Sequence, residues 1–342
     1  MNEAALANVA AHLVANDKGL LAIDESVDTC NRRFAANGIA ETLENRRRWR
    51  ELIITTPHLA QSISGVILFD ETIHQTTAEG RPLVEVLTDA GIVIGIKVDT
   101  GAKPMAGFAG ETITEGLDGL RERLRAYVAL GARFAKWRAV FNAEDGAPSP
   151  ACIDANAQAL GRYAALCQEA GLVPIVEPEL LMDGAHDIEY CAKLSQTILE
   201  AVFSQLSAQR VLLEGMILKP NMVLPGTGCA EEVTPEHVAD MTMRCFLRAV
   251  PAAVRGIAFL SGGQSPELAT ARLDAMNDRS RSKLPWPLAF SYARAIQQPA
   301  LAIWDGEACN IHLAQESLLH RARCNRAARR GTYDASTDLP SW

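Results

Sequence analysis

Short apolar runs alternate with longer amphipathic segments along most of the chain. Eight runs have the length and the Val, Ile, Leu and Phe content of buried strands, and the segments between them carry apolar residues at helical spacing. Residues 117–130 and 233–250 are two such helices, and the second begins at Thr234, followed by a first-turn proline. The eight runs are residues 20–24, 65–70, 93–98, 134–138, 173–179, 216–219, 257–263 and 288–292.

Regular alternation of strand and helix predicts a parallel sheet with right-handed crossovers. Eight repeats predict a closed (β/α)8 TIM barrel of the α/β class, and we interpret residues 1–342 as a single domain because nothing in the composition divides the chain. Residues from about 331 to 342 would form a C-terminal tail. The main alternative is an open doubly wound sheet, but the G-x-G-x-x-G turn typical of that fold is absent.

Chemistry is expected where the strands end, because the residues that follow barrel strands meet at one mouth. Charged and amide side chains stand at most of these ends. The alternative is a set of buried ion pairs that only fix the strand register, although such pairs are costly. The residues concerned are Asp24, Lys97, Asp99, Lys136, Arg138, Glu177, Glu179, Lys219 and Asn221.

Lysine is scarce in this chain, since only seven of the 33 basic residues are Lys. Arg stays charged at any working pH, whereas a desolvated Lys can lose its proton and act as an amine nucleophile. Lys219 follows the apolar stretch 211–218, so we predict that it forms a Schiff base with a carbonyl substrate. Lys136 is expected to be the second cation that helps to lower the pKa of Lys219.

Glu177 and Glu179 are candidates for the proton transfers that imine formation needs. Residues two apart on a strand face the same side, so both carboxylates can point into the barrel. Two close carboxylates raise the pKa of one of them, which would give a proton donor near neutral pH. A salt bridge that holds Lys136 in place is the alternative, and it is compatible with catalysis.

Two groups of residues suggest anion binding at opposite edges of the mouth, which would suit a bisphosphorylated substrate. Ser261, Gly262 and Gly263 lie where a strand passes into a helix start, and backbone N–H groups and the helix dipole attract phosphate there. Ser291 and Arg294 stand at the last strand, near a usual phosphate site of this fold. The second group follows the first strand and comprises Ser26, Thr29 and Arg33.

Composition narrows the classes of function. The net charge of −8 over 342 residues argues against nucleic-acid binding. Eight scattered Cys without a C-x-x-C pair indicate reduced thiols in a cytoplasmic protein, and seven His without an H-E-x-x-H motif indicate no dedicated metal site. No apolar run has the length of a membrane span. The arginine-rich stretch 321–330 is interpreted as a solvated helix face or a subunit contact.

The sequence around these residues resembles that of class I fructose-bisphosphate aldolases. The resemblance covers about residues 10–330 and follows the family's order. It implies a barrel enzyme of glycolysis and gluconeogenesis that reversibly cleaves fructose 1,6-bisphosphate to dihydroxyacetone phosphate and glyceraldehyde 3-phosphate, without metal or other cofactor, commonly as a homotetramer. The matching strings are DES at 24–26, GVILF at 65–69, GIKVD at 95–99, FAKWR at 134–138, VPIVEPE at 173–179, LKPNM at 218–222, FLSGGQS at 259–265 and FSY at 290–292.

The resemblance also implies a role for each matching residue. Lys219 would form the imine with Glu177 as its acid–base partner, and Glu179 would be a further catalytic carboxylate. Lys136 would assist carbinolamine formation, and Asp24 would handle the C4 hydroxyl proton. Ser26, Arg33 and Lys97 would hold the distal phosphate, and Ser261, Gly262 and Arg294 would hold the phosphate on C1. The further substrate-binding residues would be Thr29, Arg138, Gly263 and Ser291.

The chain departs from the family pattern at three places. Ala293 stands where members usually have Gly, Thr29 stands where many have Ser, and the tail lacks the terminal Tyr of the animal enzymes. Three alternatives stay open: an aldolase that prefers a monophosphate sugar, a non-catalytic barrel that serves as a scaffold, and a metal-dependent barrel enzyme. The expected distal-phosphate contact of Arg33 argues against the first alternative.

Overall fold

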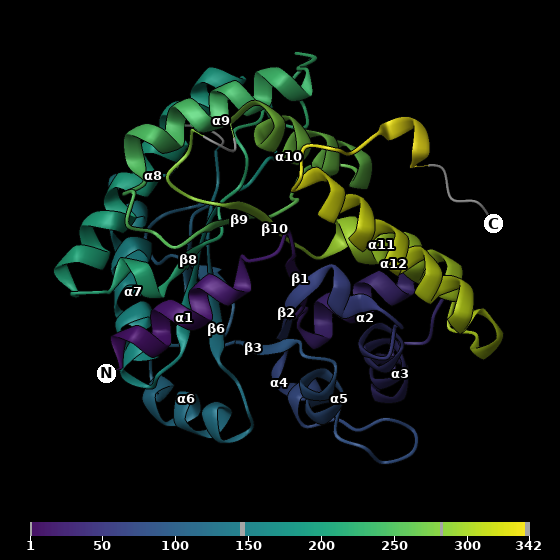
Figure 1. Ribbon diagram of the computed structural model, residues 1–342. Helices are drawn as coiled ribbons and strands as arrows, with labels where there is room; N and C mark the ends of the chain where they lie inside the picture. Colours follow the sequence, from purple (N-terminus) through teal and green to yellow (C-terminus); the bar gives the residue numbers. More distant parts are fainter. Residues whose placement is uncertain (1, 144–147, 281–282, 339–342) are drawn as a thin grey trace.

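Eight parallel strands close into a barrel in a computed structural model that describes residues 2–143, 148–280 and 283–338 (Figure 1). The strand order is β1-β10-β9-β8-β7-β6-β3-β2, and the ring is closed where Leu20 of β1 pairs with Ser291 of β10. The expected (β/α)8 barrel is confirmed. The strands are β1 (Gly19–Ile23), β2 (Ile63–Leu68), β3 (Val93–Lys97), β6 (Phe134–Phe141), β7 (Val173–Leu180), β8 (Ile217–Leu218), β9 (Ile257–Phe259) and β10 (Leu288–Tyr292).

Helices surround the barrel (Figure 1), and several of them start at a residue whose side chain caps the first turn. The hydroxyl of Thr234 accepts a hydrogen bond from the backbone N–H of His237, with Pro235 in the first turn, as the sequence predicts. The helices outside the barrel are α2 (Val27–Ala35), α3 (Leu43–Ile54), α4 (Asp70–Ile73), α5 (Leu83–Asp89), α6 (Leu120–Ala129), α7 (Pro150–Glu169), α8 (Ile188–Ala208), α9 (Pro235–Ala249), α10 (Pro266–Ser280), α11 (Arg294–Trp304) and α12 (Ile311–Ala328).

The barrel interior is a packed apolar core that helix α1 (Glu3–Leu13) covers at the amino-terminal ends of the strands. Leu6 and Leu13 of α1 join the same buried cluster as inward-facing strand residues such as Phe134. Glycine makes room for that ring, because a Cβ at Gly95 would lie 2.1 Å from the Phe134 ring. The interior is therefore filled toward the amino-terminal ends of the strands, and a cavity opens at their carboxyl ends.

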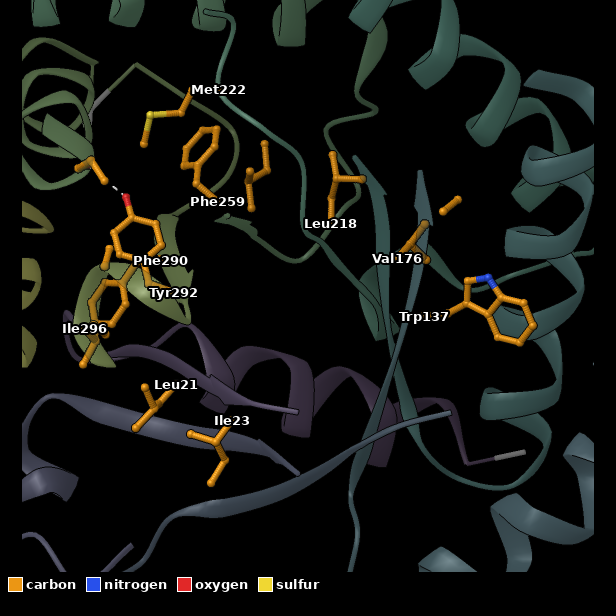
Figure 2. Packing of buried hydrophobic residues seen from close by; sticks show 14 of the residues in the cluster. Leu21, Ile23, Trp137, Val176, Leu218, Met222, Phe259, Phe290, Tyr292 and Ile296 are labelled. Carbon is orange, nitrogen blue, oxygen red and sulfur yellow. Dashed lines mark hydrogen bonds between the residues drawn. The ribbon is translucent and has the colours of Figure 1, made fainter. Parts of the chain in front are cut away.

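A second and larger core lies between the strands and the outer helices (Figure 2). Trp137 is fully buried there, with its ring centroid 5.5 Å from that of Tyr163. Tyr292 is also fully buried, and its hydroxyl donates to the carbonyl of Ala269 at 3.0 Å. These contacts hold the strand side chains that face the outer helices. The polar residues on the opposite faces of the strands and at their ends therefore have defined positions.

The structure differs from the sequence interpretation mainly where strands end. The seventh run is shorter than expected, because β9 ends at Phe259 and the chain turns so that the N–H of Leu260 bonds to the carbonyl of Pro220. After β3 the chain forms an antiparallel hairpin that the sequence analysis missed, with strands β4 (Ala102–Pro104) and β5 (Thr112–Thr114).

The segment 331–338 folds back toward α10 and α12, and residues 339–342 of the expected tail lie outside the described residues. The backbone N–H of Tyr333 donates to Asp274 of α10 at 2.8 Å. None of the helices within the described residues is long and apolar enough to span a bilayer.

Candidate active site

A cavity of about 990 Å³ opens at the carboxyl ends of the barrel strands. Hereafter it is called the mouth cavity. All of the charged strand-end residues expected to meet there line it, namely Asp24, Lys97, Asp99, Lys136, Arg138, Glu177, Glu179 and Lys219. The side-chain oxygen of Asn221 instead accepts a hydrogen bond from the backbone N–H of Leu180 and thereby supports the end of β7.

One buried carboxylate contacts two lysines. Glu177 Oε1 lies 3.0 Å from Lys219 Nζ, and Glu177 Oε2 lies 2.7 Å from Lys136 Nζ. The three residues are 3–4 % exposed. The position of Lys219 follows from the sheet, because its backbone N–H donates to the carbonyl of Val176 on β7, one residue before Glu177. Parallel pairing of adjacent strands thus places the amine beside the carboxylate.

Asp24 extends this series of charges to the opposite side of the barrel. Its Oδ2 accepts a hydrogen bond from Lys136 Nζ at 3.0 Å, so Lys136 lies between two carboxylates. Burial alone would raise the pKa of Asp24, but the charges of Lys136 and Lys219 outweigh it and lower the pKa to about 2. Asp24 is therefore a carboxylate at neutral pH, which is the ionisation state that can accept a proton.

Burial lowers the pKa of both lysines. For Lys219 the desolvation effect exceeds the opposing attraction of Asp24 and Glu179, and the nearby Arg138 guanidinium adds to the lowering. For Lys136 burial brings the pKa to about 8 against the attraction of Asp24, with Lys219 contributing as a neighbouring cation. The lowered pKa favours the uncharged amine that a Schiff-base nucleophile requires.

Glu179 differs from Glu177 in its partner. Its carboxylate is ion-paired with Arg138, on β6, instead of with a lysine. Burial favours a raised pKa for Glu179, but the charge and hydrogen bond of Arg138 outweigh it and the pKa is lowered. The expectation of a carboxyl group with a raised pKa is therefore not met at Glu179, because a cation lies against it.

Residues after β9 and β10 form one edge of the mouth cavity. Ser261 and Gly262 line it, whereas Gly263 lies behind the lining with a positive φ of 73°. A Cβ at Gly263 would lie 2.6 Å from the Cβ of Met182, so both the backbone conformation and the close approach require glycine. Ser291 and Arg294 also line this edge, and the Ser291 hydroxyl is buried without a hydrogen-bond partner among the described residues.

Ala293, which replaces the usual family glycine, has a φ of −105° just before α11. The φ is negative, so this position does not need the left-handed conformation that favours glycine. The N-terminus of α11 can therefore approach an anion here much as a glycine-containing member would.

Residues after β1 and β3 form a second edge, which adjoins the first where β1 lies next to β10. Ser26 caps α2, and its hydroxyl bonds to both the backbone N–H and the hydroxyl of Thr29. Both residues line the cavity, as does Lys97, whose Nζ lies 2.6 Å from Asp99 Oδ1. Cations are thus present at both edges of the cavity.

Arg33, which is expected to be a direct phosphate ligand, is not among the residues that line the mouth cavity. Its guanidinium is ion-paired with Glu25 and donates to Gln297 Oε1 at 3.0 Å. Arg32 lines the cavity instead, as do Arg123 and Lys103 from segments that the sequence analysis did not connect with the site. The helical phase of α2 is the signal that separates Arg32 from Arg33, and the sequence analysis did not use it.

Comparison with known proteins agrees with this geometry. A family model described as fructose-bisphosphate aldolase class-I matches residues 5–341. The chain belongs to the class I fructose-bisphosphate aldolases. It is 53 % identical over 329 residues to a probable class 1 aldolase of Xanthomonas campestris pv. campestris, covering 96 % of this chain and 98 % of that protein. It is 49 % identical over 330 residues to cytosolic aldolase 4 of Arabidopsis thaliana, covering 96 % and 84 % respectively.

A solved aldolase structure from Plasmodium falciparum has the same fold. Its TM-score is 0.95 at 44 % sequence identity, and the match covers 97 % of this chain and 96 % of that one. The protein is thus a lyase of glycolysis that cleaves fructose 1,6-bisphosphate through a lysine imine, since class I aldolases use this metal-independent route. The scaffold and metal-dependent alternatives are set aside by this membership.

Proposed function

We propose that Lys219 is the imine-forming residue of this aldolase, with Glu177 as the group that transfers protons to and from the bound intermediate. The observation that carries this proposal is the pair of contacts made by Glu177, 3.0 Å to Lys219 Nζ and 2.7 Å to Lys136 Nζ. An acid–base group within hydrogen-bond reach of the nucleophile is the arrangement that covalent catalysis by an amine requires.

Imine formation has two stages. The uncharged amine of Lys219 attacks the C2 carbonyl and gives a carbinolamine, and loss of its hydroxyl as water then leaves the protonated imine. Glu177 lies where it can deliver the proton that the departing hydroxyl needs, and Lys136 can stabilise the developing charge on that oxygen. The apolar core below the site limits the access of competing water from the barrel interior.

Carbon–carbon cleavage uses the carboxylate on the other side of Lys136. Asp24 accepts the proton of the C4 hydroxyl, the C3–C4 bond breaks, and its electron pair moves into the imine to form an enamine. The aldehyde product leaves at this point. Asp24 is ionised at neutral pH, with a pKa lowered to about 2, so it is in the correct state to accept the proton. Protonation of the enamine at C3 and hydrolysis then release dihydroxyacetone phosphate and regenerate Lys219.

The two edges of the mouth cavity would bind the two phosphates. Ser261, Gly262, Ser291 and Arg294 suit the phosphate on C1, because N–H groups, hydroxyls and a guanidinium gather there. Gly263 allows the loop after β9 to adopt a positive φ and to pack closely against Met182.

At the other edge, Ser26, Thr29 and Lys97 suit the distal phosphate. Arg33 supports both edges indirectly, because it holds Glu25 after β1 and donates to Gln297 of α11, and Arg138 positions Glu179 near the reacting carbons. A bisphosphorylated sugar would thus be held at both ends. An aldolase that prefers a monophosphate sugar would not need the residues of this second edge. Relative rates on fructose 1,6-bisphosphate and fructose 1-phosphate distinguish an enzyme that prefers the bisphosphate from one that prefers the monophosphate.

Borohydride trapping tests the assignment of Lys219. Reduction in the presence of dihydroxyacetone phosphate should add the three-carbon phosphate to the peptide that contains Lys219, as read by mass spectrometry. Lys219→Arg should abolish trapping, whereas Lys193→Arg on the exposed side of α8 should leave it unchanged. An adduct on Lys136 or Lys97 would transfer the nucleophilic role to that residue.

We further propose a homotetramer in the cytoplasm. The family resemblance supports the assembly, and the described surface exposes large apolar side chains, with Leu43 59 % and Leu247 57 % exposed. The plant relatives described as cytosolic or cytoplasmic support the location. Light scattering coupled to gel filtration should give four chains per particle, and a monomeric mass would refute the assembly.

A further inference from the structure

Three side chains with metal-binding chemistry converge outside the mouth cavity, where the segment 331–338 meets helix α12. The distance from His320 Nε2 to Asp338 Oδ1 is 2.8 Å, that from Cys324 Sγ to Asp338 Oδ1 is 3.2 Å, and that from Cys324 Sγ to His320 Nε2 is 3.5 Å. None of the three lines the mouth cavity. The cluster therefore has no part in the reaction described above.

The chain brings these groups together in two ways. His320 and Cys324 are four residues apart on α12, a spacing that puts two ligands on one face of a helix and is used in helical zinc sites. Asp338 arrives from the segment that folds back over α12, and its side chain is only 4 % exposed. The cluster exists only when that segment is in place.

Neighbouring groups orient the Asp338 carboxylate. Its Oδ2 accepts hydrogen bonds from the guanidinium of Arg321 and the hydroxyl of Tyr333, so Oδ1 is left facing His320 and Cys324. Carboxylates that bind a metal through one oxygen are commonly held through the other in this manner. The side chain of His320 is 28 % exposed, which leaves a path for a cation and for a water molecule.

We propose that His320, Cys324 and Asp338 form a binding site for a zinc-like divalent cation, with water as the fourth ligand. Imidazole nitrogen, thiolate sulfur and carboxylate oxygen are the ligand types that zinc prefers. Tetrahedral coordination at usual zinc–ligand lengths separates such atoms by about 3.3–3.6 Å. The sulfur–nitrogen distance already has this value, and the two distances to Asp338 need to widen by a few tenths of an ångström.

Charge at the cluster is compatible with a cation. Thiolate and carboxylate together carry two negative charges, and Arg321 offsets one of them. Without a cation, the Cys324 sulfhydryl donates a hydrogen bond to Asp338 Oδ1, as a thiol does. Binding then replaces the thiol proton by the metal and releases that proton to solvent. The consequence would be a direct link between the segment 331–338 and α12.

Cobalt titration of the full chain, after removal of metals with EDTA, tests the proposal. Tetrahedral Co²⁺ with a thiolate ligand should give intense visible bands and a sulfur-to-metal charge-transfer band at one equivalent per chain, and Zn²⁺ should displace it. Cys324→Ser should remove the charge-transfer band. His320→Ala and Asp338→Asn should each weaken Co²⁺ binding by at least about tenfold.

Matched variants on the same part of the chain serve as controls. Cys309→Ser and His312→Ala change exposed residues just before and at the start of α12, and both should keep the full spectrum. Retained borohydride trapping would show that each cluster variant is folded. The proposal fails if the wild-type chain gives only the weak spectrum of octahedral Co²⁺, or if the charge-transfer band survives in Cys324→Ser or is lost in Cys309→Ser.

Discussion

Lys136 Nζ and Glu177 Oε2 lie 2.7 Å apart, and both side chains are almost completely buried. This contact ties the carboxylate proposed as the acid–base group to a cation that is itself shared with Asp24. The proposed proton transfers at Glu177 and Asp24 would therefore be coupled through one ammonium group, and removal of any member should affect the others.

Replacement of Glu177 by Gln should lower kcat by about 10²–10⁴, which is the usual range for loss of an acid–base group. Substrate binding should be largely retained, since the phosphate contacts are elsewhere, and the rate of borohydride trapping should fall with kcat. Glu179→Gln is the comparison, because that carboxylate pairs with Arg138. A loss below about threefold in Glu177→Gln would move the role to Glu179.

Substitutions at the two edges of the mouth cavity should show which edge binds which phosphate of the substrate. Arg294→Ala should weaken fructose 1,6-bisphosphate and fructose 1-phosphate alike, by about 10–100-fold in kcat/KM, as expected for a charged hydrogen bond. Lys97→Met should affect mainly the bisphosphate. Arg33→Ala should change both substrates equally, because Glu25 holds its guanidinium outside the cavity lining. A bisphosphate-specific loss in Arg33→Ala would restore it as a direct ligand.

Acid should destabilise the fold partly through Asp24. Its pKa is about 2 in the folded state against an ordinary 3.8, so the carboxylate stabilises the fold above pH 3.8, and this contribution is lost as the pH falls toward 2. One such group contributes a slope of up to about 1.4 kcal/mol per pH unit in that window. Asp24→Asn should flatten the dependence of unfolding free energy on pH, measured by urea titration. An unchanged slope would contradict the assignment.

Gly263→Ala should destabilise the protein by about 2–4 kcal/mol, because it combines left-handed backbone strain with overpacking against Met182. Gly91→Ala provides the control for strain alone, since its φ is 72° and no atom lies within 4 Å of the added Cβ. The control should lose only about 1–2 kcal/mol. Urea midpoints at constant m measure both, and equal losses would exclude the clash with Met182.

Deletion of Ser341-Trp342 should change the cleavage rate and the enamine proton-exchange rate by less than about fivefold, or about 1 kcal/mol of barrier. These two residues lie outside the described residues. The reason for the prediction is chemical, because an indole N–H is only a hydrogen-bond donor. Tyr333, the other candidate in the tail, donates its hydroxyl to Asp338 and does not line the mouth cavity. A hundredfold loss of proton exchange with intact trapping would contradict this prediction.

Barrel topology and the strand-end lysines could be predicted from sequence because both depend on local patterns. Apolar runs locate the strands, and parallel pairing then brings their ends together whatever the loops do. Lys219 and Glu177 meet for this reason. The position of Arg33 could not be predicted in the same way, because one step along α2 turns a side chain by about 100°. Glu25, which holds it, is chosen by tertiary packing.

The arginine-rich stretch 321–330 shows the same limit. Its composition is typical of a solvated helix, yet Arg321 and Arg329 are 4 % and 5 % exposed. Arg321 is covered by Asp338, and Arg329 donates to backbone carbonyls of Leu288 and Val14. The His320, Cys324 and Asp338 cluster was missed because its third member comes from a segment whose return over α12 has no signature in the local pattern.

Closure of the barrel between Leu20 and Ser291 has a consequence for biosynthesis. The strand that completes the ring leaves the ribosome long after its partner, on the order of tens of seconds later at ordinary rates of translation. Until then β1 has an open edge, and Leu6 and Leu13 of α1 have no finished ring to cover. The nascent chain therefore exposes aggregation-prone apolar surface for most of its synthesis. Chaperone binding should concentrate on its amino-terminal third and should end once residues 288–292 have emerged.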